Sequence, residues 1–219
     1  MTDRRAAREM AAQAVAAGRP LEWFEQVYAA AGSGGTPVPW DDQVVNPHLA
    51  SWPRLDPAVM RRALVVGCGY GTDAQWLAAR GCAVTAFDIS PSAVAAARDR
   101  FPASPVDYQV ADLLDLPQAW AAEPFDLVVE AYTLQVLPPG SPERAAAVAA
   151  LAAVTGGTLL VIARGRDEGD DPGAMPWPLL ASELAPLAGL GLAQAAFDDY
   201  LDDEDPPRRR FRVTYARGG

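Results

Sequence analysis

The sequence lacks lysine entirely and contains only one histidine and two cysteines in 219 residues. Its 18 basic residues are therefore all arginines, which excludes Schiff-base chemistry and lysine general-base mechanisms, because both need an amine whose pKa can fall. One imidazole and two thiols are too few for a structural zinc site or a disulfide framework. We therefore expect no metal centre, and we expect Cys68 and Cys82 to be free thiols.

Positive charge is scarce as well. The 18 basic residues face 28 acidic ones, which gives a formal net charge of −10. That balance argues against nucleic acid, whose phosphates need a basic face, and against anionic membrane surfaces. No stretch approaches the run of about 18 strongly apolar residues that spans a bilayer. The Ala-rich start of the chain contains Gln13 and lacks the dense apolar centre of a signal sequence, so we expect a cytoplasmic protein. The sequence leaves the oligomeric state open.

The apolar content of the sequence is that of an ordinary globular protein. Half of the residues are hydrophobic, which excludes a disordered or fibrous chain, and the length fits one domain with a real core. Two parts of that domain differ in rhythm: residues 1–60 predict an N-terminal helical lid, and residues 61–219 predict the core. The elements expected in the lid are helices at 3–17 and 21–31, a Gly- and Pro-rich loop at 32–42 and a short helix at 44–52.

From Arg61 onward, short apolar runs alternate with helical patterns, which is typical of a parallel sheet covered on both faces. Ser90 and Ser141, each followed by proline, are expected to begin two of the helices. The expected strands are 63–67, 83–88, 106–112, 125–131 and 158–164, and the expected helices are 73–81, 90–100 and 141–154.

The tail departs from this rhythm. Residues 193–197 and 210–216 have the pattern of two strands, and the segment between them is too short for a helical crossover, so we expect an antiparallel hairpin. The predicted fold class is therefore α/β: a Rossmann-like doubly wound sheet, mostly parallel, with a C-terminal antiparallel hairpin and an N-terminal helical lid.

A glycine run follows the first expected strand. Gly67, Gly69 and Gly71 lie between a strand and a helix, where missing side chains let a ligand approach the backbone and the helix N-terminal amides. A dinucleotide-binding G-x-G-x-x-G motif would need glycine at Thr72, and a Walker loop would need lysine. Taken alone, the run is a weak signal, because a structural turn can have the same glycines.

Two aspartates stand at the ends of the next two strands. Asp88 is placed to accept hydrogen bonds from ribose hydroxyls, and Asp112 to accept one from an adenine amino group. Each is also a plausible cap of a helix or turn. Because the glycine run and both aspartates fall at the carboxyl ends of three successive strands, they indicate one ligand-binding crevice.

These segments resemble a known family. LVVGCGYG, AFDIS, VADLLDLP and FDLVVEAYTLQVLPP are similar to the ordered motifs of class I S-adenosylmethionine-dependent methyltransferases, and the resemblance covers about 61–164. PVPWDDQVVNPHL and GTDAQWLAARG resemble the small-molecule branch of thiopurine S-methyltransferases and tellurite-resistance methyltransferases. Many members of the family carry an acidic residue two positions before the first glycine, where this chain has Val65.

The resemblance implies S-adenosylmethionine as the cofactor and a small molecule as the acceptor. The glycines would line the methionine part, while Ile89 and Leu113 would flank the adenine ring. Trp40 would cover the cofactor from the lid, and Glu130 and Thr133 would border the sulfonium. The complete implied set is Trp40, Gly67, Gly69, Gly71, Asp88, Ile89, Asp112, Leu113, Glu130 and Thr133.

Catalysis by such a protein rests mainly on positioning. Methyl transfer from a sulfonium is an in-line displacement, so the protein must align the acceptor and exclude water. A thiol or aromatic amine needs no dedicated base, whereas a phenol or alcohol benefits from one. The candidate catalytic side chains are Asp41, His48 and Tyr132. Each has an alternative reading: a structural contact for Asp41, packing of a lid helix for His48 and an aromatic wall of the acceptor pocket for Tyr132.

The candidate acceptor contacts are three aromatic residues and two arginines: Tyr28, Tyr70, Trp177, Arg164 and Arg166. Arg164 and Arg166 end the fifth expected strand, where they can hold an acidic group of the acceptor or pair with the aspartates at 167, 170 and 171. The overall negative charge favours neutral or cationic acceptors, with these arginines as the local exception. The resemblance to the thiopurine branch favours thiol or heteroaromatic acceptors.

Two other functions stay open. A non-catalytic protein can bind S-adenosylmethionine or a nucleotide on the same fold, because fold alone does not fix function. A nucleotide-dependent oxidoreductase is the third alternative, and Thr72 counts against it.

Overall fold

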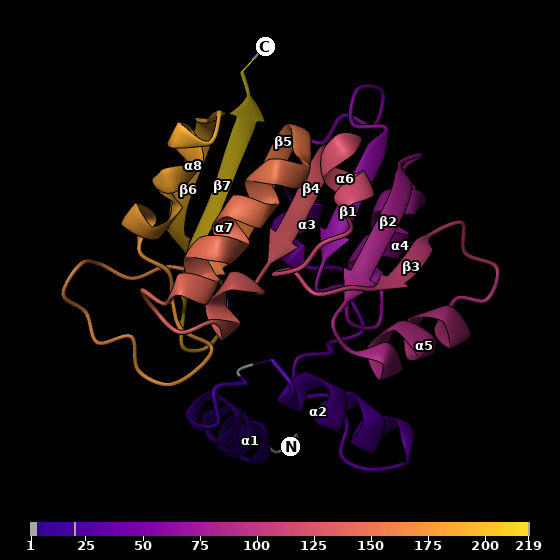
Figure 1. The fold of residues 1–219 in the computed structure, drawn as a ribbon, viewed down its shortest axis with the longest axis vertical. Helices are drawn as coiled ribbons and strands as arrows, with labels where there is room; N and C mark the ends of the chain where they lie inside the picture. Colours follow the sequence, from indigo (N-terminus) through magenta and orange to yellow (C-terminus); the bar gives the residue numbers. More distant parts are fainter. Residues whose placement is uncertain (1–3, 20, 219) are drawn as a thin grey trace.

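A seven-stranded sheet forms the centre of the computed structural model, which describes residues 4–19 and 21–218. The strands are β1 Arg62–Val66, β2 Ala83–Asp88, β3 Asp107–Val110, β4 Phe125–Ala131, β5 Thr155–Arg164, β6 Leu192–Leu201 and β7 Arg209–Arg217. Their order in the sheet is β3-β2-β1-β4-β5-β7-β6 (Figure 1). β1 to β5 are parallel, whereas β7 pairs antiparallel with both β5 and β6. The predicted fold class is confirmed.

Helices cover the sheet and its carboxyl edge. They are α1 Arg4–Ala16, α2 Trp23–Gly32, α3 Pro47–Ala50, α4 Thr72–Ala78, α5 Pro91–Arg100, α6 Gln118–Ala122, α7 Pro142–Val154 and α8 Pro186–Gly189, with short 3-10 turns η1 Leu134–Val136 and η2 Ala181–Leu184. The Ser90 hydroxyl accepts the N–H of Ala93 at 3.0 Å, and that of Ser141 accepts the N–H of Arg144 at 3.2 Å. The two predicted N-caps are therefore confirmed.

None of the described helices is long and apolar enough to cross a membrane.

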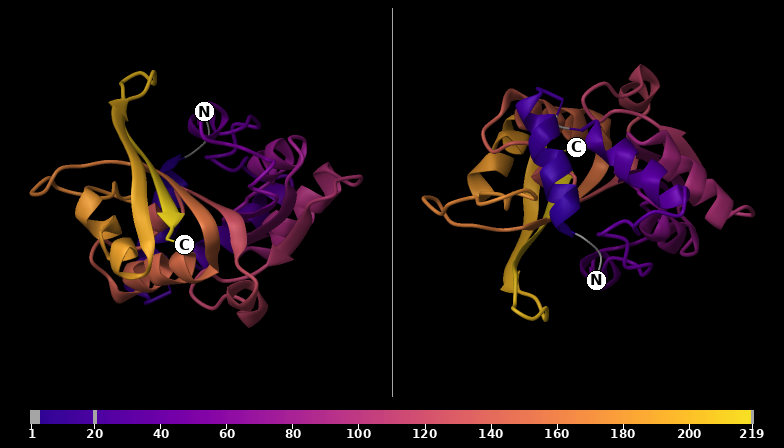
Figure 2. Two further views of the ribbon diagram at one scale, coloured as in Figure 1. Left: turned by 90° about the horizontal axis from the view of Figure 1, so that it is seen from above. Right: turned by 90° about the horizontal axis from the view of Figure 1, so that it is seen from below.

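Both faces of the sheet are buried at its central strands β1, β4 and β5, as their near-continuous apolar sequences require. In β1, Leu64 and Val66 belong to the core that α7 covers, while Ala63 and Val65 belong to the core that α4 covers. The first two helices of the lid, α1 and α2, lie across the carboxyl ends of the parallel strands (Figure 1; Figure 2, right). This arrangement puts the lid over the edge where parallel sheets bind ligands.

Two local expectations in this part of the chain differ from the structure, and a third lies partly outside the described residues. The helix expected at 44–52 is limited to α3, where the Asn46 carboxamide oxygen accepts the N–H of His48 at 2.9 Å and begins the helix late. The third strand ends at Val110 because Asp112 begins a turn, in which its Oδ1 accepts the N–H of Leu114 at 2.8 Å. The helix expected at 3–17 begins with a residue that lies outside the described part.

The first hairpin strand is longer than the expected 193–197. β6 continues to Leu201 through the acidic residues Asp198 and Asp199. These carboxylates pair with arginines on β7, Asp198 with Arg212 at 2.9 Å and Asp199 with Arg209 at 2.7 Å. The cross-strand ion pairs allow an acidic stretch, which the sequence analysis assigned to the connection between the two strands, to form part of the first strand.

Candidate functional site

The glycine loop joins β1 to α4. Gly67, Gly69 and Gly71 have φ angles of +60°, +52° and +84°, a left-handed conformation that favours glycine. A Cβ atom at Gly67 would also collide with the Thr133 hydroxyl, and one at Gly71 with the ring of Tyr108. The loop therefore needs glycine both for its own conformation and for the close approach of these neighbours, and Gly67 is the exposed one of the three.

Asp88 ties the end of β2 to this loop. Its Oδ2 accepts the backbone N–H of Gly69 and its Oδ1 accepts that of Ser90, both at 2.9 Å. Burial raises the pKa of Asp88, against the lowering effect of these hydrogen bonds. Each carboxylate oxygen has two acceptor positions, so Asp88 retains capacity for a ligand hydroxyl. Ile89 follows it and is half-buried.

The second aspartate lies at the end of the next strand. Asp112 is half-buried, and its Oδ1 is occupied by the turn to Leu114. Leu113 is only 5% exposed and packs in the core that α7 covers, where Phe87 also lies. The position of Asp112 beside the ends of β2 and β3 agrees with the predicted crevice, while the Leu113 side chain contributes to the core beneath it.

The end of β4 brings a buried carboxyl group to the same edge. Glu130 is fully buried, and its Oε1 accepts the N–H of Leu134 at 2.9 Å. Its Oε2 has no hydrogen-bond partner among the residues that the structure describes. Burial raises the pKa of Glu130 to about 7. Tyr132 then adopts a left-handed φ of +68°, and the Thr133 hydroxyl donates to the carbonyl of Val66 at 3.5 Å.

The lid contacts the glycine loop through aromatic side chains. The Tyr28 ring of α2 meets the Tyr70 ring edge-on, with centroids 5.2 Å apart. The indole N–H of Trp40 donates to the Tyr28 hydroxyl at 2.9 Å. A Cβ at Gly69 would lie 2.9 Å from that hydroxyl, so Tyr28 rests directly on the loop.

Glu25 anchors the lid, and the sequence reasoning missed it. Its carboxylate accepts the hydroxyl hydrogens of Ser90 and Ser92, both at 2.6 Å, and the backbone N–H of Ser92 at 3.1 Å. Ser90 and Ser92 stand at the start of α5, where the helix dipole favours an acidic partner. The only signal in the sequence was an acidic residue on a predicted lid helix, which does not reveal its partner.

The three candidate catalytic residues are each engaged with other parts of the protein. Asp41 lies 3.8 Å from the guanidinium of Arg100. The Nδ1 of His48 is 2.7 Å from the Tyr200 hydroxyl, and burial, followed by the charge of Arg210, lowers the pKa of His48. His48 thus faces the β6–β7 pair.

Tyr132 is held from two sides. Its hydroxyl is hydrogen-bonded to the side chain of Asn46, and the guanidinium of Arg210 lies 5.4 Å from its ring centroid. Burial raises the pKa of Tyr132 to about 12. The N–H of Asn46 also donates to Asp73 at 2.8 Å, so Asn46, which the sequence reasoning did not single out, connects Tyr132 with the helix after the glycine loop.

The loop after β5 contacts the lid. Arg166 donates to the backbone carbonyls of Pro178 and Asp170, each at 3.2 Å, and therefore braces this loop. Trp177 is half-buried, and its indole N–H donates to a carbonyl of the same loop. Met175 packs against the apolar cluster of α1 and α2. The loop and the lid are thus in contact above the sheet edge.

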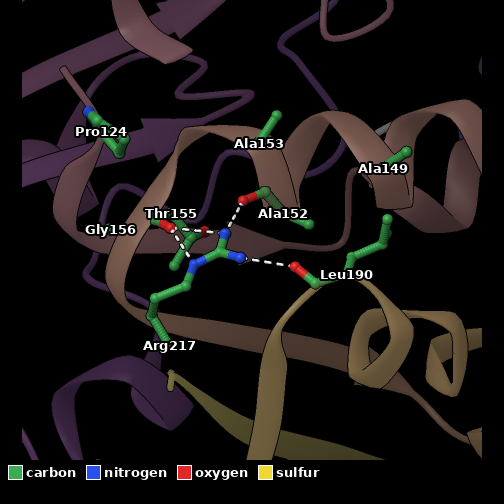
Figure 3. Close-up of a pocket in the computed structure, with 8 residues that line it drawn as sticks. All are labelled: Pro124, Ala149, Ala152, Ala153, Thr155, Gly156, Leu190 and Arg217. Atoms are coloured by element: carbon green, nitrogen blue, oxygen red, sulfur yellow. Dashed lines mark hydrogen bonds between the residues drawn. The ribbon is translucent and has the colours of Figure 1, made fainter. Parts of the chain in front are cut away.

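A hollow of about 470 Å³ lies at the other end of β5 and is distinct from the predicted crevice (Figure 3). The Arg217 guanidinium crosses it and donates to the carbonyls of Thr155 and Leu190 at 3.0 and 2.6 Å, and also to that of Ala152. These bonds attach the end of β7 to the α7–β5 corner. We assign this hollow a structural role, because its lining consists mainly of small apolar residues and this committed arginine.

The middle of the chain is similar in sequence to a known protein family. Residues 63–157, which contain the glycine loop, Asp88, Asp112 and Glu130, match the family model of a methyltransferase domain. No curated protein matches the chain in sequence.

Solved structures match nearly the whole chain. A methyltransferase dependent on S-adenosylmethionine from Anabaena variabilis ATCC 29413 has a TM-score of 0.71 at 19% identity, covering 89% of this chain and 93% of that one. A structure from work on the conversion of a disulfide bond into a thioacetal group during echinomycin biosynthesis has a TM-score of 0.70 at 24% identity, covering 90% and 91%. The N-methyltransferase NodS from Bradyrhizobium japonicum WM9, in complex with S-adenosylhomocysteine, has a TM-score of 0.66 at 20% identity, covering 89% and 100%.

These matches show the fold of the chain. Residues 63–157 are similar to a methyltransferase domain, and the chain as a whole has the Rossmann-like fold seen in S-adenosylmethionine-dependent methyltransferases. They do not single out the thiopurine or tellurite-resistance branch.

Proposed function

We propose that this protein transfers a methyl group from S-adenosylmethionine to a small-molecule acceptor. The observation that carries the proposal is the glycine loop, held by the Asp88 carboxylate at the carboxyl edge of β1 and β2 and covered by the lid. A sheet edge of this kind, with a carboxylate at the end of the second strand, suits a nucleoside with an extended polar tail.

The residues of the crevice fit this cofactor. The backbone of Gly67, Gly69 and Gly71 would hold the methionine part, Asp88 the ribose and Asp112 the adenine amino group. The unpartnered Oε2 of Glu130, at the end of β4, supports a polar contact from the same side, where Thr133 also lies. When bound, the cofactor supplies a methyl group on a sulfonium, which is already activated toward displacement.

The chain's own residues would orient the reactants and exclude water. Tyr28, Trp40 and Tyr70 form an aromatic contact between lid and glycine loop, and Ile89 would lie against the adenine. Because Asp41, His48 and Tyr132 are all engaged elsewhere, the arrangement favours positioning over general-base catalysis. A thiol or heteroaromatic nucleophile suits such a site, since it loses its proton without a dedicated base.

The acceptor would bind where the lid meets the loop after β5. Tyr28, Tyr70 and Trp177 provide aromatic surface there, and Met175 closes the contact with α1 and α2.

We further propose that residues 1–60 act as a lid within the same domain, and that the protein acts in the cytoplasm without nucleic-acid or membrane partners.

Calorimetric titration with S-adenosylhomocysteine tests the proposal. We expect saturable binding that the Asp88→Ala variant loses, because the ribose contact and the support of the glycine loop disappear together. Asp107→Ala is the matched control, since Asp107 lies at the amino end of β3. Absence of binding to the folded wild-type protein would contradict the proposal.

The two alternatives give different results. A non-catalytic binding protein would bind S-adenosylhomocysteine but transfer no label from methyl-labelled S-adenosylmethionine across a broad panel of thiol, amine and phenol acceptors. An oxidoreductase would bind a nicotinamide dinucleotide in the same titration, which we do not expect.

A further inference from the structure

Arginines are concentrated on β5, on β7 and in the loops beside these two strands. Five of them donate to carboxylates or to backbone carbonyls: Arg166, Arg209, Arg210, Arg212 and Arg217. The backbone N–H of Arg164 bonds to the Gln135 side chain, but its guanidinium forms no hydrogen bond or ion pair with any residue that the structure describes. Arg208 also lacks such a partner, but it is exposed to water in the hairpin tip.

Burial makes the difference between these two arginines. Arg164 is half-buried, so its guanidinium has lost part of its hydration without gaining a partner, which is costly for a charged group. Burial is also the main cause that lowers the pKa of Arg164, followed by the charges of Arg210 and Arg208. The carboxylate of Glu204 opposes these effects less strongly than either arginine contributes to them.

The strand register places a second positive charge opposite Arg164. Arg164 lies directly opposite Arg210 in the β5–β7 ladder, and like charges at opposed positions destabilise an antiparallel pair. Arg210 is neutralised by the two carboxylates of Asp202 and Glu204. The positive charge of Arg164 therefore remains uncompensated within the described residues.

Arg164 lies at the edge where the acceptor is expected. It is the last residue of β5, and Leu160 and Ile162, which share its face by strand alternation, pack in the same cluster as Tyr132. The guanidinium of its opposed neighbour Arg210 lies over the Tyr132 ring. Tyr132 in turn precedes Thr133, which touches the glycine loop. An anion at Arg164 would thus bind one strand away from the end of β4.

We infer that Arg164 binds a carboxylate of the methyl acceptor. This inference rests on the proposed function and names the class of substrate. The planar guanidinium matches a carboxylate with two parallel hydrogen bonds. A single negative charge suits a single uncommitted guanidinium, whereas a phosphate dianion would need a second cation, and the neighbouring Arg210 is already neutralised by Asp202 and Glu204. The acceptor would be an anion despite the negative charge of the whole chain.

Benzoate is a suitable probe, because it combines a carboxylate with an aromatic ring for the expected pocket. We expect benzoate to bind, in calorimetric titration, to protein saturated with S-adenosylhomocysteine, and benzamide, which has the same shape without the charge, to bind at least tenfold more weakly. Arg164→Gln should abolish this preference for benzoate. Arg208→Gln removes an exposed charge that acts on Arg164 only through space, so it should weaken the preference but retain most of it.

Three results would overturn the inference: no benzoate binding by wild-type protein, a preference for benzoate that survives in Arg164→Gln, or an equal loss in Arg208→Gln. We expect Arg164→Gln to melt at the wild-type temperature or above it, because no partner is removed. If it does not fold, Arg164→Lys serves instead, with a reduced preference expected because the charge remains and the fork is lost.

The experiment separates this inference from the proposed function. Binding of S-adenosylhomocysteine without binding of benzoate would contradict the role of Arg164 and leave the methyltransferase proposal standing. If S-adenosylhomocysteine does not bind, the proposed function fails, and the benzoate titration of the cofactor-free protein still decides whether Arg164 holds a carboxylate.

Discussion

Carboxylates are held in two different ways in two regions of this molecule. In the glycine-loop region (residues 62–131), the carboxyl groups of Asp73, Asp88 and Glu130 accept backbone N–H groups, and burial raises the pKa of each. In the hairpin region (residues 192–217), Asp199 is bound by an arginine, whose hydrogen bonds lower its pKa. The first region buries its carboxyl groups against backbone N–H groups, whereas the second uses them to hold strands together.

The largest expected effect comes from the most buried ion pair of the hairpin region. The side chains of Arg210 and Asp202 are 5% and 2% exposed, so Arg210→Met leaves a buried carboxylate without its partner. We expect a loss of about 3–5 kcal/mol in the free energy of unfolding, measured with urea. Arg209→Met is the control, because Arg209 and Asp199 are each about a third exposed and such pairs contribute about 1 kcal/mol or less. Equal losses in both variants would contradict this account.

The next effect tests the glycine-loop region. The pKa of Glu130 is raised from 4.5 to about 7, so the native state binds its proton more tightly than the unfolded state does. The stability that this proton provides is complete below pH 4.5 and is lost as the pH rises through 7. Glu130→Gln cannot lose a proton, so we expect it to gain about 3 kcal/mol relative to wild type between pH 4.5 and pH 8.

Urea unfolding at several pH values measures this difference. Glu123→Gln provides the control, since the Glu123 side chain is 80% exposed. Any constant cost of burying the amide shifts the Glu130→Gln curve without changing its slope. A difference that does not vary with pH would show that Glu130 stays ionised in the folded protein.

A smaller effect concerns the anchor of the lid. Glu25→Gln removes the charge that accepts hydrogen bonds from Ser90 and Ser92. We expect the lid to open about 1 kcal/mol more easily, which makes proteolysis in the loop 32–42 roughly fivefold faster in the free protein. Saturation with S-adenosylhomocysteine should slow cleavage at 32–42 in both forms. Equal cleavage with and without this ligand would remove the lid from the binding site.

Features that depend on neighbouring residues could be predicted from the sequence. The N-caps Ser90 and Ser141 follow from serine-proline pairs, and the parallel strands follow from apolar runs that end at glycine or aspartate. The position of the candidate crevice followed from the same strand ends. No partner distant in the sequence was needed for these predictions.

Features that depend on distant partners were missed. Helix α6 is short, and its Trp120 is buried against Phe87 and Phe125, with ring centroids 5.3 and 6.0 Å away. The anchor at Glu25 and the uncompensated charge of Arg164 likewise depend on residues far along the chain. Local patterns do not carry this information, because each side chain is typical of a surface position until its partner is known.

The smallest expected effect gives the sharpest test of the comparison, because its sign is opposite to that at Glu130. Arg209 lowers the pKa of Asp199 below its usual value of 3.8, so the pair stabilises the protein above that pH and the stability is lost as the pH falls through the lower, folded value. Asp199→Asn should therefore cost less than about 1 kcal/mol at pH 6, and the difference from wild type should shrink toward pH 3. Urea unfolding at the two pH values measures it. A difference that grew with falling pH would mean that the hairpin carboxylates are governed by burial, as in the glycine-loop region, and the contrast between the two regions would fail.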